Sequence, residues 1–264
     1  MASPSIWLVG CGNMGGAMLR GWLGAGIAAD GILVIDPIDA HVPEGVRAVA
    51  KADGPAPDIL LLGIKPQMLD EVAPTLAIGA ETIVISILAG VECAVLAKKL
   101  PGARHYVRVM PNMPAAIGEG VSAVFAPHLS NADRHRVEGL VSPLGPVEWI
   151  DDEGLFHAVT GISGSGPAFV LRFIEALAEA GRKAGLEADL SLRLALQTVA
   201  GTARLVQTTG RSPADLAEAV RSPNGTTHAG LLVLDASDLT QILDATVKAT
   251  ADRSSEMAAA ARAS

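Results

Sequence analysis

The chain has 264 residues, a net charge of −8 and a hydrophobic content of 50%, although aromatic residues total only 3%. This length allows two domains of modest size, with cores built from small aliphatic side chains. A net negative charge argues against a nucleic-acid-binding protein, which needs a basic face. No apolar run reaches the roughly 18–20 residues that cross a bilayer. No basic segment precedes the first apolar run either, so we expect neither a membrane span nor a signal peptide.

The cysteines and histidines carry no motif. Cys11 and Cys93 are the two cysteines and are not joined in a CxxC pair, while the six histidines are scattered without an HExxH pattern. We therefore expect two reduced thiols in a cytoplasmic protein and no metal site.

Short apolar runs and helical segments alternate over the first 150 residues. Such alternation predicts crossover units and a parallel sheet. We expect strands at 6–10, 32–36, 58–64, 81–90, 105–111, 120–127 and 146–150, and helices at about 14–23, 66–74, 91–100 and 128–145.

After about residue 152 the pattern becomes helical. Apolar residues recur at helical spacing along 167–181, which indicates an amphipathic helix. Ser212 followed by Pro213 is typical of a helix start. The sequence therefore predicts an α/β domain over 1–155 and an all-α domain over 156–264. We expect helices at 167–181, 189–209, 226–234 and 238–263, and a short helix that starts at Pro213.

A glycine motif joins the first predicted strand to the first predicted helix. Gly10, Gly12 and Gly15 follow the spacing GxGxxG. The first glycine permits a tight turn, the second lets backbone amides approach a pyrophosphate, and the third lets the helix pack closely on the strand. This context predicts a Rossmann-like dinucleotide-binding domain; the alternative is a glycine turn without a ligand.

Asp36 ends the second predicted strand. An acid at this place hydrogen-bonds the adenosine ribose and repels a 2′-phosphate, which favours NAD over NADP. No Arg or Lys follows closely, since the next residues are "PIDAH". The alternative is that Asp36 caps a turn before Pro37 and faces water.

Three further loops follow strands at the edge where open α/β sheets bind ligands. They are "GIKPQ" at 63–67, "ILAGV" at 87–91 and "MPNMPA" at 110–115. Lys65 of the first loop either faces a ligand at this edge or is a solvated loop lysine without a function. Asn112 presents an amide rigidly between two prolines, where it either bonds a ligand or holds a turn.

Two polar stretches precede helices in the second half. They are "SGSGPA", which contains Ser163 and Ser165, and "RSPNGTTHAG" at 221–230. Amides at a helix start have no intrahelical acceptor. Two such starts can together hold a small carboxylate through amides and hydroxyls. The alternative for the first stretch is a well-capped helix between domains.

Six segments make the chain similar to the pyrroline-5-carboxylate reductase family over about residues 6–260. They are "GCGNMG", "GIKPQ", "ILAGV", "RVMPNMPA", "AVTGISGSGPAF" and "SPNGTTHAGL". The resemblance implies reduction of the cyclic imine 1-pyrroline-5-carboxylate to L-proline, with NADPH or NADH as the cofactor. It also implies that the all-α domain is a dimerisation domain, which makes the protein a homodimer or a larger homo-oligomer.

The resemblance assigns roles by position. Thr227 would lie near the ring nitrogen as the catalytic residue, and Asn112 near the nicotinamide. The other substrate-binding residues would be Ser222, Pro223, Asn224, Gly225, Thr226, Ser163 and Ser165. The other cofactor-binding residues would be Val9, Gly10, Cys11, Gly12, Asn13, Met14, Gly15, Asp36, Gly63, Ile64, Lys65, Pro66, Ile87, Leu88 and Ala89.

Some positions depart from the family. Asn224 replaces a common glycine, Met113 a common threonine and Phe169 a common tyrosine. The family often prefers NADPH, whereas Asp36 favours NADH, so the preference stays open.

Two other functions fit parts of the chain. A β-hydroxyacid dehydrogenase would need a lysine in the helix after a glycine-rich loop, and "PAFVLRFIEALAEAG" has none. A non-catalytic dinucleotide-binding regulator would keep the first glycine loop, but would have no need of two polar helix starts.

Overall fold

The structure is a computed structural model that describes residues 5–37, 42–52 and 54–263. These residues form two compact units. The first runs up to Ser165 and also includes the segment from Lys248 onward, and the second is Gly166–Val247. The domain boundary near residue 155 stays a prediction, because compactness does not say which segment folds alone.

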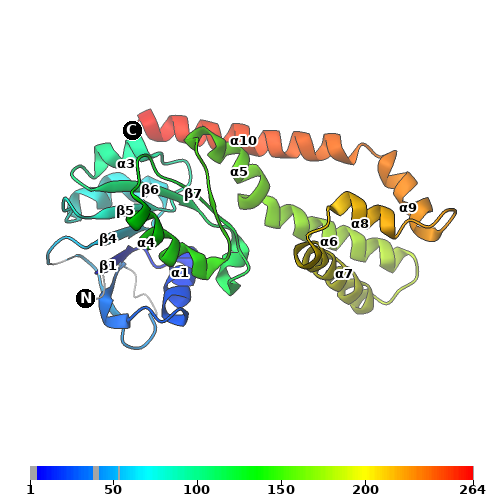
Figure 1. Ribbon diagram of the computed structural model, residues 1–264, viewed down its shortest axis with the longest axis horizontal. Helices are drawn as coiled ribbons and strands as arrows, with labels where there is room; N and C mark the ends of the chain where they lie inside the picture. Colours follow the sequence, from blue (N-terminus) through cyan, green and yellow to red (C-terminus); the bar gives the residue numbers. More distant parts are fainter. Residues whose placement is uncertain (1–4, 38–41, 53, 264) are drawn as a thin grey trace. The chain divides into compact units, whose positions relative to one another are not determined.

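The first unit is built on an eight-stranded sheet of order β3-β2-β1-β4-β5-β6-β7-β8 among the described residues (Figure 1). All neighbouring strands are parallel except β6 and β7. The chain order reverses direction between β1 and β4, which makes the carboxyl ends of these strands a switch point. The strands are β1 Ile6–Val9, β2 Ile32–Ile35, β3 Arg47–Val49, β4 Ile59–Leu62, β5 Ile83–Ser86, β6 His105–Met110, β7 Ser122–Phe125 and β8 Val147–Trp149.

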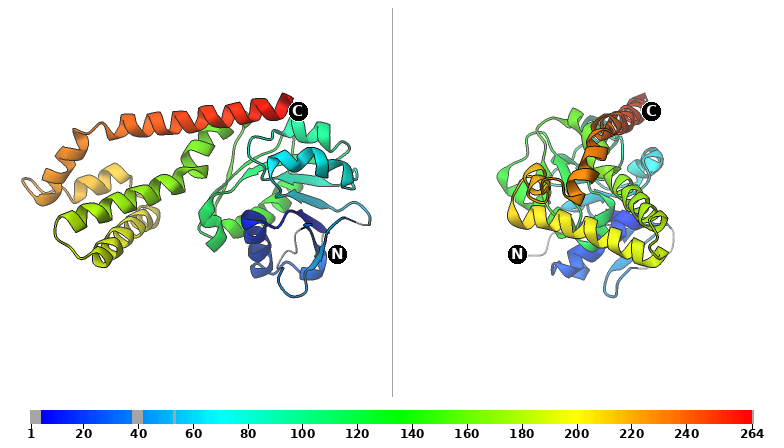
Figure 2. Two further views of the ribbon diagram at one scale, coloured as in Figure 1. Left: turned by 180° about the vertical axis from the view of Figure 1, so that it is seen from behind. Right: turned by 90° about the vertical axis from the view of Figure 1, so that its right-hand side faces the viewer.

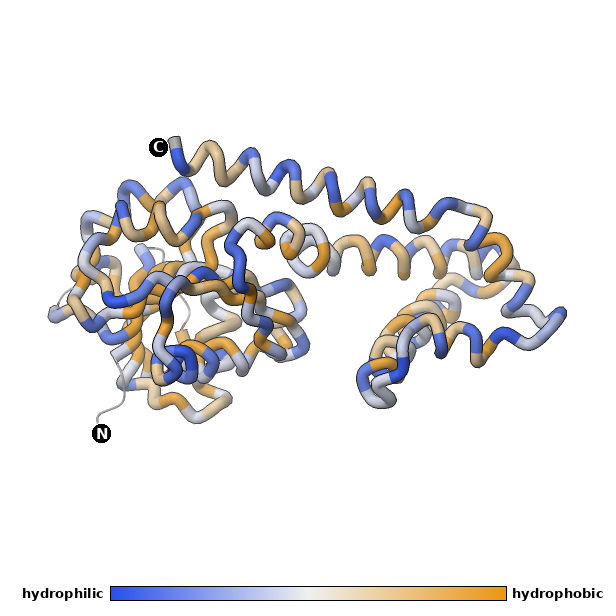
Figure 3. The backbone as a smooth tube through the Cα atoms, turned by 45° about the horizontal axis from the view of Figure 1, so that its top comes forward, coloured by the Kyte–Doolittle hydropathy of each residue, from blue (hydrophilic) through white to orange (hydrophobic). Residues whose placement is uncertain are grey.

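The central strands are buried on both faces, because helices cover both sides of the sheet. Alternate residues point to opposite faces, so Ile6 and Leu8 belong to one core cluster and Trp7 and Val9 to the other. The first cluster includes side chains of α1 (Asn13–Gly24) and α4 (Asn131–Val141), and the second those of α2 (Leu69–Val72) and α3 (Cys93–Lys99). The hydrophobic strands are visible inside this unit in Figure 3.

The sequence prediction of the first unit is correct for seven strands and differs at two places. The sequence does not predict strand β3, because it lies at the sheet edge and Arg47 and Ala48 are exposed. The helix expected at 66–74 is broken into α2 between two 3₁₀ turns. Pro74 explains the break, since a proline lacks the amide that would continue the helix.

The second unit contains only helices, as the sequence predicts (Figure 2). They are α6 Gly166–Lys183, α7 Ala188–Thr209, α8 Pro213–Ala219, α9 Thr226–Asp235 and the first part of α10 Leu239–Ala263. Helices α6 and α7 pack closely where Ser191 donates a hydrogen bond to the Ala178 carbonyl at 2.6 Å. A side chain on Gly181 would clash with the same Ser191 hydroxyl, so this contact depends on the glycine.

The second unit has almost no core of its own. Only Ile174, Ser191 and Ala195 are buried between residues 166 and 247. Large apolar side chains stay exposed instead, for example Phe173 at 53% and Val233 at 67%. Apolar surface of this extent is typical of a face that another protein surface covers.

A buried arginine holds the segment that follows β8. Arg108 of β6 is 3% exposed, lies 3.3 Å from a Glu153 carboxylate oxygen and stacks over the Phe156 ring at 4.4 Å. The same Glu153 oxygen accepts a hydrogen bond from the Cys93 amide at 2.9 Å. Burial, with the nearby Glu153 charge, raises the pKa of the Cys93 thiol to about 12. Arg108 therefore ties the sheet, α3 and the residues before α5 (Phe156–Val159) together.

We expect Arg108→Ala to lower the free energy of unfolding of the first unit by about 2–4 kcal/mol, because it leaves Glu153 without its cation and removes packing on Phe156. All three tryptophans lie in this unit, so urea unfolding followed by their fluorescence measures it. Arg182→Ala is the control, since that arginine forms an exposed ion pair with Glu179. An equal effect of both variants would contradict the anchoring role of Arg108.

Candidate functional site

The glycine loop after β1 is built by close backbone approach. Gly10 has a φ of +89°, and a side chain on it would come within 2.8 Å of the Gly63 backbone. A side chain on Gly15 would clash with the Gly10 carbonyl, whereas nothing lies within 4 Å of a side chain placed on Gly12. Gly10 and Gly15 are thus required for packing, and Gly12 faces open space. Helix α1 starts at Asn13 without a side-chain cap, which leaves its first amides available.

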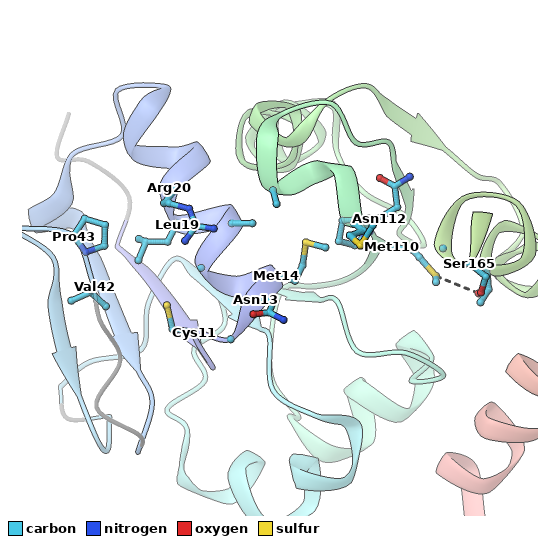
Figure 4. A pocket seen from close by; sticks show the side chains of 18 residues that line it. Cys11, Asn13, Met14, Leu19, Arg20, Val42, Pro43, Met110, Asn112 and Ser165 are labelled. Carbon is cyan, nitrogen blue, oxygen red and sulfur yellow. Dashed lines mark hydrogen bonds between the residues drawn. The ribbon is translucent and has the colours of Figure 1, made fainter. Parts of the chain in front are cut away.

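A cavity of about 1060 Å³ opens in front of this loop. Figure 4 shows it running from Val42, Pro43 and Arg20 past Asn13 and Met14 to Asn112 and Ser165. Of the predicted site residues, Cys11, Gly12, Asn13, Met14, Asn112 and Ser165 line it.

Asp36 lies against the glycine loop. One of its carboxylate oxygens accepts a hydrogen bond from the Cys11 amide at 2.8 Å. Asp36 thus contacts the glycine loop, and its role toward a ligand stays a prediction. Burial, together with the Asp36 charge, raises the pKa of the Cys11 thiol, and the Arg20 charge opposes the rise. Asp36 and Arg20 therefore bring opposite charges to the same end of the site.

The loops after β4 and β5 support the site more than they line the large cavity. The Gly63 amide donates to the Val9 carbonyl at 2.7 Å, so Gly63 packs behind the glycine loop. Leu88 is buried, while Ala89 lines a smaller cavity of about 420 Å³. Within the sheet unit, the predicted residues that do not line the large cavity are Val9, Gly10, Gly15, Asp36, Gly63, Ile64, Lys65, Pro66, Ile87, Leu88, Ala89 and Ser163.

Asn112 holds a turn, which is one of the two roles that the sequence leaves open, and its ligand-binding role stays a prediction. Its side-chain oxygen accepts a hydrogen bond from the Val121 amide at 3.0 Å, which fixes the turn after β6. Its side chain also lines the large cavity. The amide NH₂ of Asn112 therefore stays oriented and can donate to a ligand.

A π-helical turn, Thr160–Gly164, carries the "TGISG" part of the second glycine loop. The Ser165 amide donates to the Thr160 carbonyl at 2.8 Å, and a side chain on Gly164 would come 2.6 Å from the Met110 methyl group. Ser163 donates its hydroxyl to the Val159 carbonyl at 3.1 Å and does not line the cavity. Thr160 and Met110 do line it, and the sequence analysis missed both. Thr160 does lie inside the quoted segment at 158–169, but nothing in the sequence distinguishes it from its neighbours there.

The loop 222–227 lies in the second unit and is tightly organised. Asn224 adopts a φ of +58°, as expected where glycine is common, and the Gly225 amide donates to the Ser222 carbonyl at 3.0 Å. Helix α9 begins at Thr226 without a side-chain cap. Arg221 donates from Nε to Nδ1 of His228 at 2.9 Å, which joins the two ends of the loop. The first amides of α9 are therefore presented by a closed loop.

Within residues 5–37, 42–52 and 54–263, no group of three or more His, Cys, Asp or Glu side chains could hold a metal ion. In the same ranges, no helix has the length and apolarity needed to cross a membrane.

Two family models match the chain. Residues 153–257 match the model described as pyrroline-5-carboxylate reductase dimerisation. Residues 5–90 match the model described as NADP oxidoreductase coenzyme F420-dependent. The two matches fall on the helical half and on the sheet that carries the glycine loop.

Known proteins resemble the chain along nearly its whole length. The pyrroline-5-carboxylate reductase of Pseudomonas aeruginosa is 35% identical over 274 residues, which cover 98% of both chains. That of Synechocystis is 43% identical over 202 residues, covering 76% of this chain and 75% of the relative.

Solved structures agree with these relatives. A pyrroline-5-carboxylate reductase from Coxiella burnetii superposes with a TM-score of 0.86 at 27% identity, covering 97% of this chain and 98% of that one. A Plasmodium falciparum pyrroline carboxylate reductase, solved with NADP bound, gives 0.82 at 27% identity, covering 98% and 99%. With full-length relatives at 35% identity and a matching fold, the chain belongs to the pyrroline-5-carboxylate reductase family.

Proposed function

We propose that this protein reduces 1-pyrroline-5-carboxylate to L-proline with NADPH or NADH. The observation that carries the proposal is the large cavity, which joins the uncapped start of α1 to the polar wall of Asn112 and Ser165. A dinucleotide needs such an arrangement, with its phosphates at a helix start and its reactive ring at the far end. The names of the full-length relatives support the same reaction.

The chain's own residues would hold the cofactor through the glycine loop. We propose that the amides at Gly12 and Asn13 bind the pyrophosphate, that Asp36 bonds the ribose, and that Asn112 donates its NH₂ to the nicotinamide carboxamide. When bound, the reduced nicotinamide supplies a hydride to the carbon of the C=N bond. The imine nitrogen of the substrate takes its proton from solvent. Orientation of the two reactants is the chief contribution of the protein.

The loop 222–227 of the helical unit is our proposed site for the substrate carboxylate, and Ser163 and Ser165 of the sheet unit stay proposed substrate-binding residues. The amides at the start of α9 attract an anion. The loop conformation is fixed by Asn224 and by the bond between Arg221 and His228. The Thr227 hydroxyl would then orient the ring nitrogen of the imine.

We also propose that residues 156–264 form a dimerisation domain and that the protein works as a homodimer or larger homo-oligomer in the cytoplasm. The helical unit exposes large apolar side chains and buries only three of its own. Both cysteines are free thiols, which suits a reducing compartment.

The test of the reaction follows the loss of NADPH or NADH absorbance on addition of 1-pyrroline-5-carboxylate. We expect turnover by the wild type and a fall in kcat/KM of about 10- to 100-fold in Thr227→Ala, because one hydrogen bond strengthened at the transition state is lost. Thr227→Ser keeps the hydroxyl and should retain most of the activity. Unchanged kinetics in Thr227→Ala would remove Thr227 from the mechanism. Turnover of a 3-hydroxyacid with oxidised cofactor, and none of the imine, would overturn the proposed reaction.

Asp36→Asn tests the cofactor preference. We expect the ratio of kcat/KM with NADPH to kcat/KM with NADH to rise about ten-fold, because the variant removes a negative charge from the ribose end of the site. The asparagine oxygen can still accept from the Cys11 amide, so the loop should stay intact. Asp30→Asn is the matched control, since Asp30 is exposed and lies outside the large cavity. A ratio that changes equally in both variants would contradict this role.

The oligomer is tested by light scattering on the purified protein. We expect a dimer or a larger assembly for the wild type, and a shift toward monomer in Phe173→Glu, because a charge in a covered apolar face is costly. Arg172→Gln is the control, as this neighbouring side chain is polar and exposed. A monomeric wild type would refute the proposed assembly.

A further inference from the structure

We propose that Thr160 is a cofactor-positioning residue, and that the buried Ser254 of α10 holds it in place. This inference rests on the proposed function. Its starting point is that Thr160 and Ser165 each line both the large cavity and the smaller cavity of about 420 Å³. These two residues therefore form the wall that the cavities share.

The Thr160 hydroxyl is held in one orientation. It donates a hydrogen bond to the Phe156 carbonyl at 2.7 Å, and its oxygen lies 3.3 Å from the Met110 sulfur and 3.5 Å from the Ser254 hydroxyl. Because its proton goes to the nearer Phe156 carbonyl, the Thr160 oxygen can accept a hydrogen bond from the Ser254 hydroxyl.

Ser254 comes from the segment after Lys248, which belongs to the first unit. It is only 7% exposed, and its hydroxyl lies 3.0 Å from Nδ1 of His157. The segment is packed tightly at this place, since a side chain on Gly90 would come 3.3 Å from the Met257 Cβ and Ala258 is fully buried. Ser254 is thus fixed by its helix and by His157, and it limits the movement of Thr160.

The position of this wall explains why it matters for the reaction. The glycine loop is the proposed phosphate end of the large cavity, so the nicotinamide belongs at the end formed by Asn112, Thr160 and Ser165. Beyond the wall, the smaller cavity is bounded by Ala89, Gly90 and α10. A ring placed against Thr160 would be held by Asn112 on its carboxamide and by the Thr160 oxygen, which retains room to accept a hydrogen bond. Small errors in this placement are costly for hydride transfer.

The experiment compares Thr160→Val, which removes only the hydroxyl, with Thr160→Ser, which keeps it. We expect Thr160→Val to lower kcat about ten-fold and to increase the primary isotope effect seen with C4-deuterated NADPH, while KM for 1-pyrroline-5-carboxylate changes less than about three-fold. Thr160→Ser should stay within about three-fold of the wild type. The matched control is Thr209→Val, because the Thr209 hydroxyl makes the same kind of bond to the carbonyl four residues earlier, on exposed α7.

A double-mutant cycle tests the role of Ser254. We expect Ser254→Ala to lower kcat in the same direction as Thr160→Val, and the double variant to be no slower than Thr160→Val alone, because both changes act on one contact. Additive losses would refute the coupling. Thermal unfolding of each variant identifies a change that acts through stability alone, and Thr160→Ser keeps the proposal testable where Thr160→Val fails to fold.

The outcomes separate the inference from the proposed function. Binding of NADPH, measured by its fluorescence, and turnover of the imine by the wild type test the function itself. If the wild type is active and Thr160→Val behaves like Thr209→Val, the inference is wrong and the function stands. If the wild type neither binds NADPH nor reduces the imine, both fail.

Discussion

The candidate site depends on a contact between backbones in which no side chain can take part. Gly10, Gly15 and Gly63 bring the end of β1, the start of α1 and the end of β4 together, and a side chain on any of the three would meet backbone atoms at 2.9 Å or less. This contact sets the direction of α1, and with it the direction of the free amides at its start. The amides can face a phosphate only because the helix lies this close to the sheet. The geometry of the large cavity follows from that approach.

A second constraint comes from the far end of the chain. The segment from Lys248 onward packs with the sheet unit, so the unit that carries the glycine loop is made from both ends of the sequence. This segment contacts the residues around the smaller cavity, where Met257 lies against Gly90 and Ser254 lies against His157. The helical unit shows the opposite case, because it buries only three side chains and exposes many apolar ones. The sheet unit is therefore stabilised within the chain, whereas the helical unit has apolar surface left for a partner.

The sequence predicts much of this arrangement where the signal is local. Buried strands are continuous apolar runs, and the glycine spacing marks the start of α1, so both are found without a structure. Strand β3 cannot be predicted in this way, because its exposed residues show no apolar pattern. The helix at 66–74 is overestimated because Pro74 lacks the amide that would continue α2. The sequence does not reveal Thr160 for a different reason, since its contacts with Met110 and Ser254 join residues 50 and 94 positions apart. Such a contact is visible only after the chain has folded.

Asp36 has two properties that bear on the proposed cofactor preference, its negative charge and its hydrogen bond to the glycine loop. Asp36 would place a negative charge at the proposed ribose end, and its carboxylate also accepts a hydrogen bond from the Cys11 amide of the glycine loop. A residue without an acceptor would remove the charge but also release that amide into the site, where it could bind a phosphate. Charge and loop geometry therefore change together in most substitutions at this position. Arg20, at the same end of the cavity, contributes the opposite charge. Our proposal for the preference between NADH and NADPH therefore rests on Asp36, the Cys11 amide and Arg20 together.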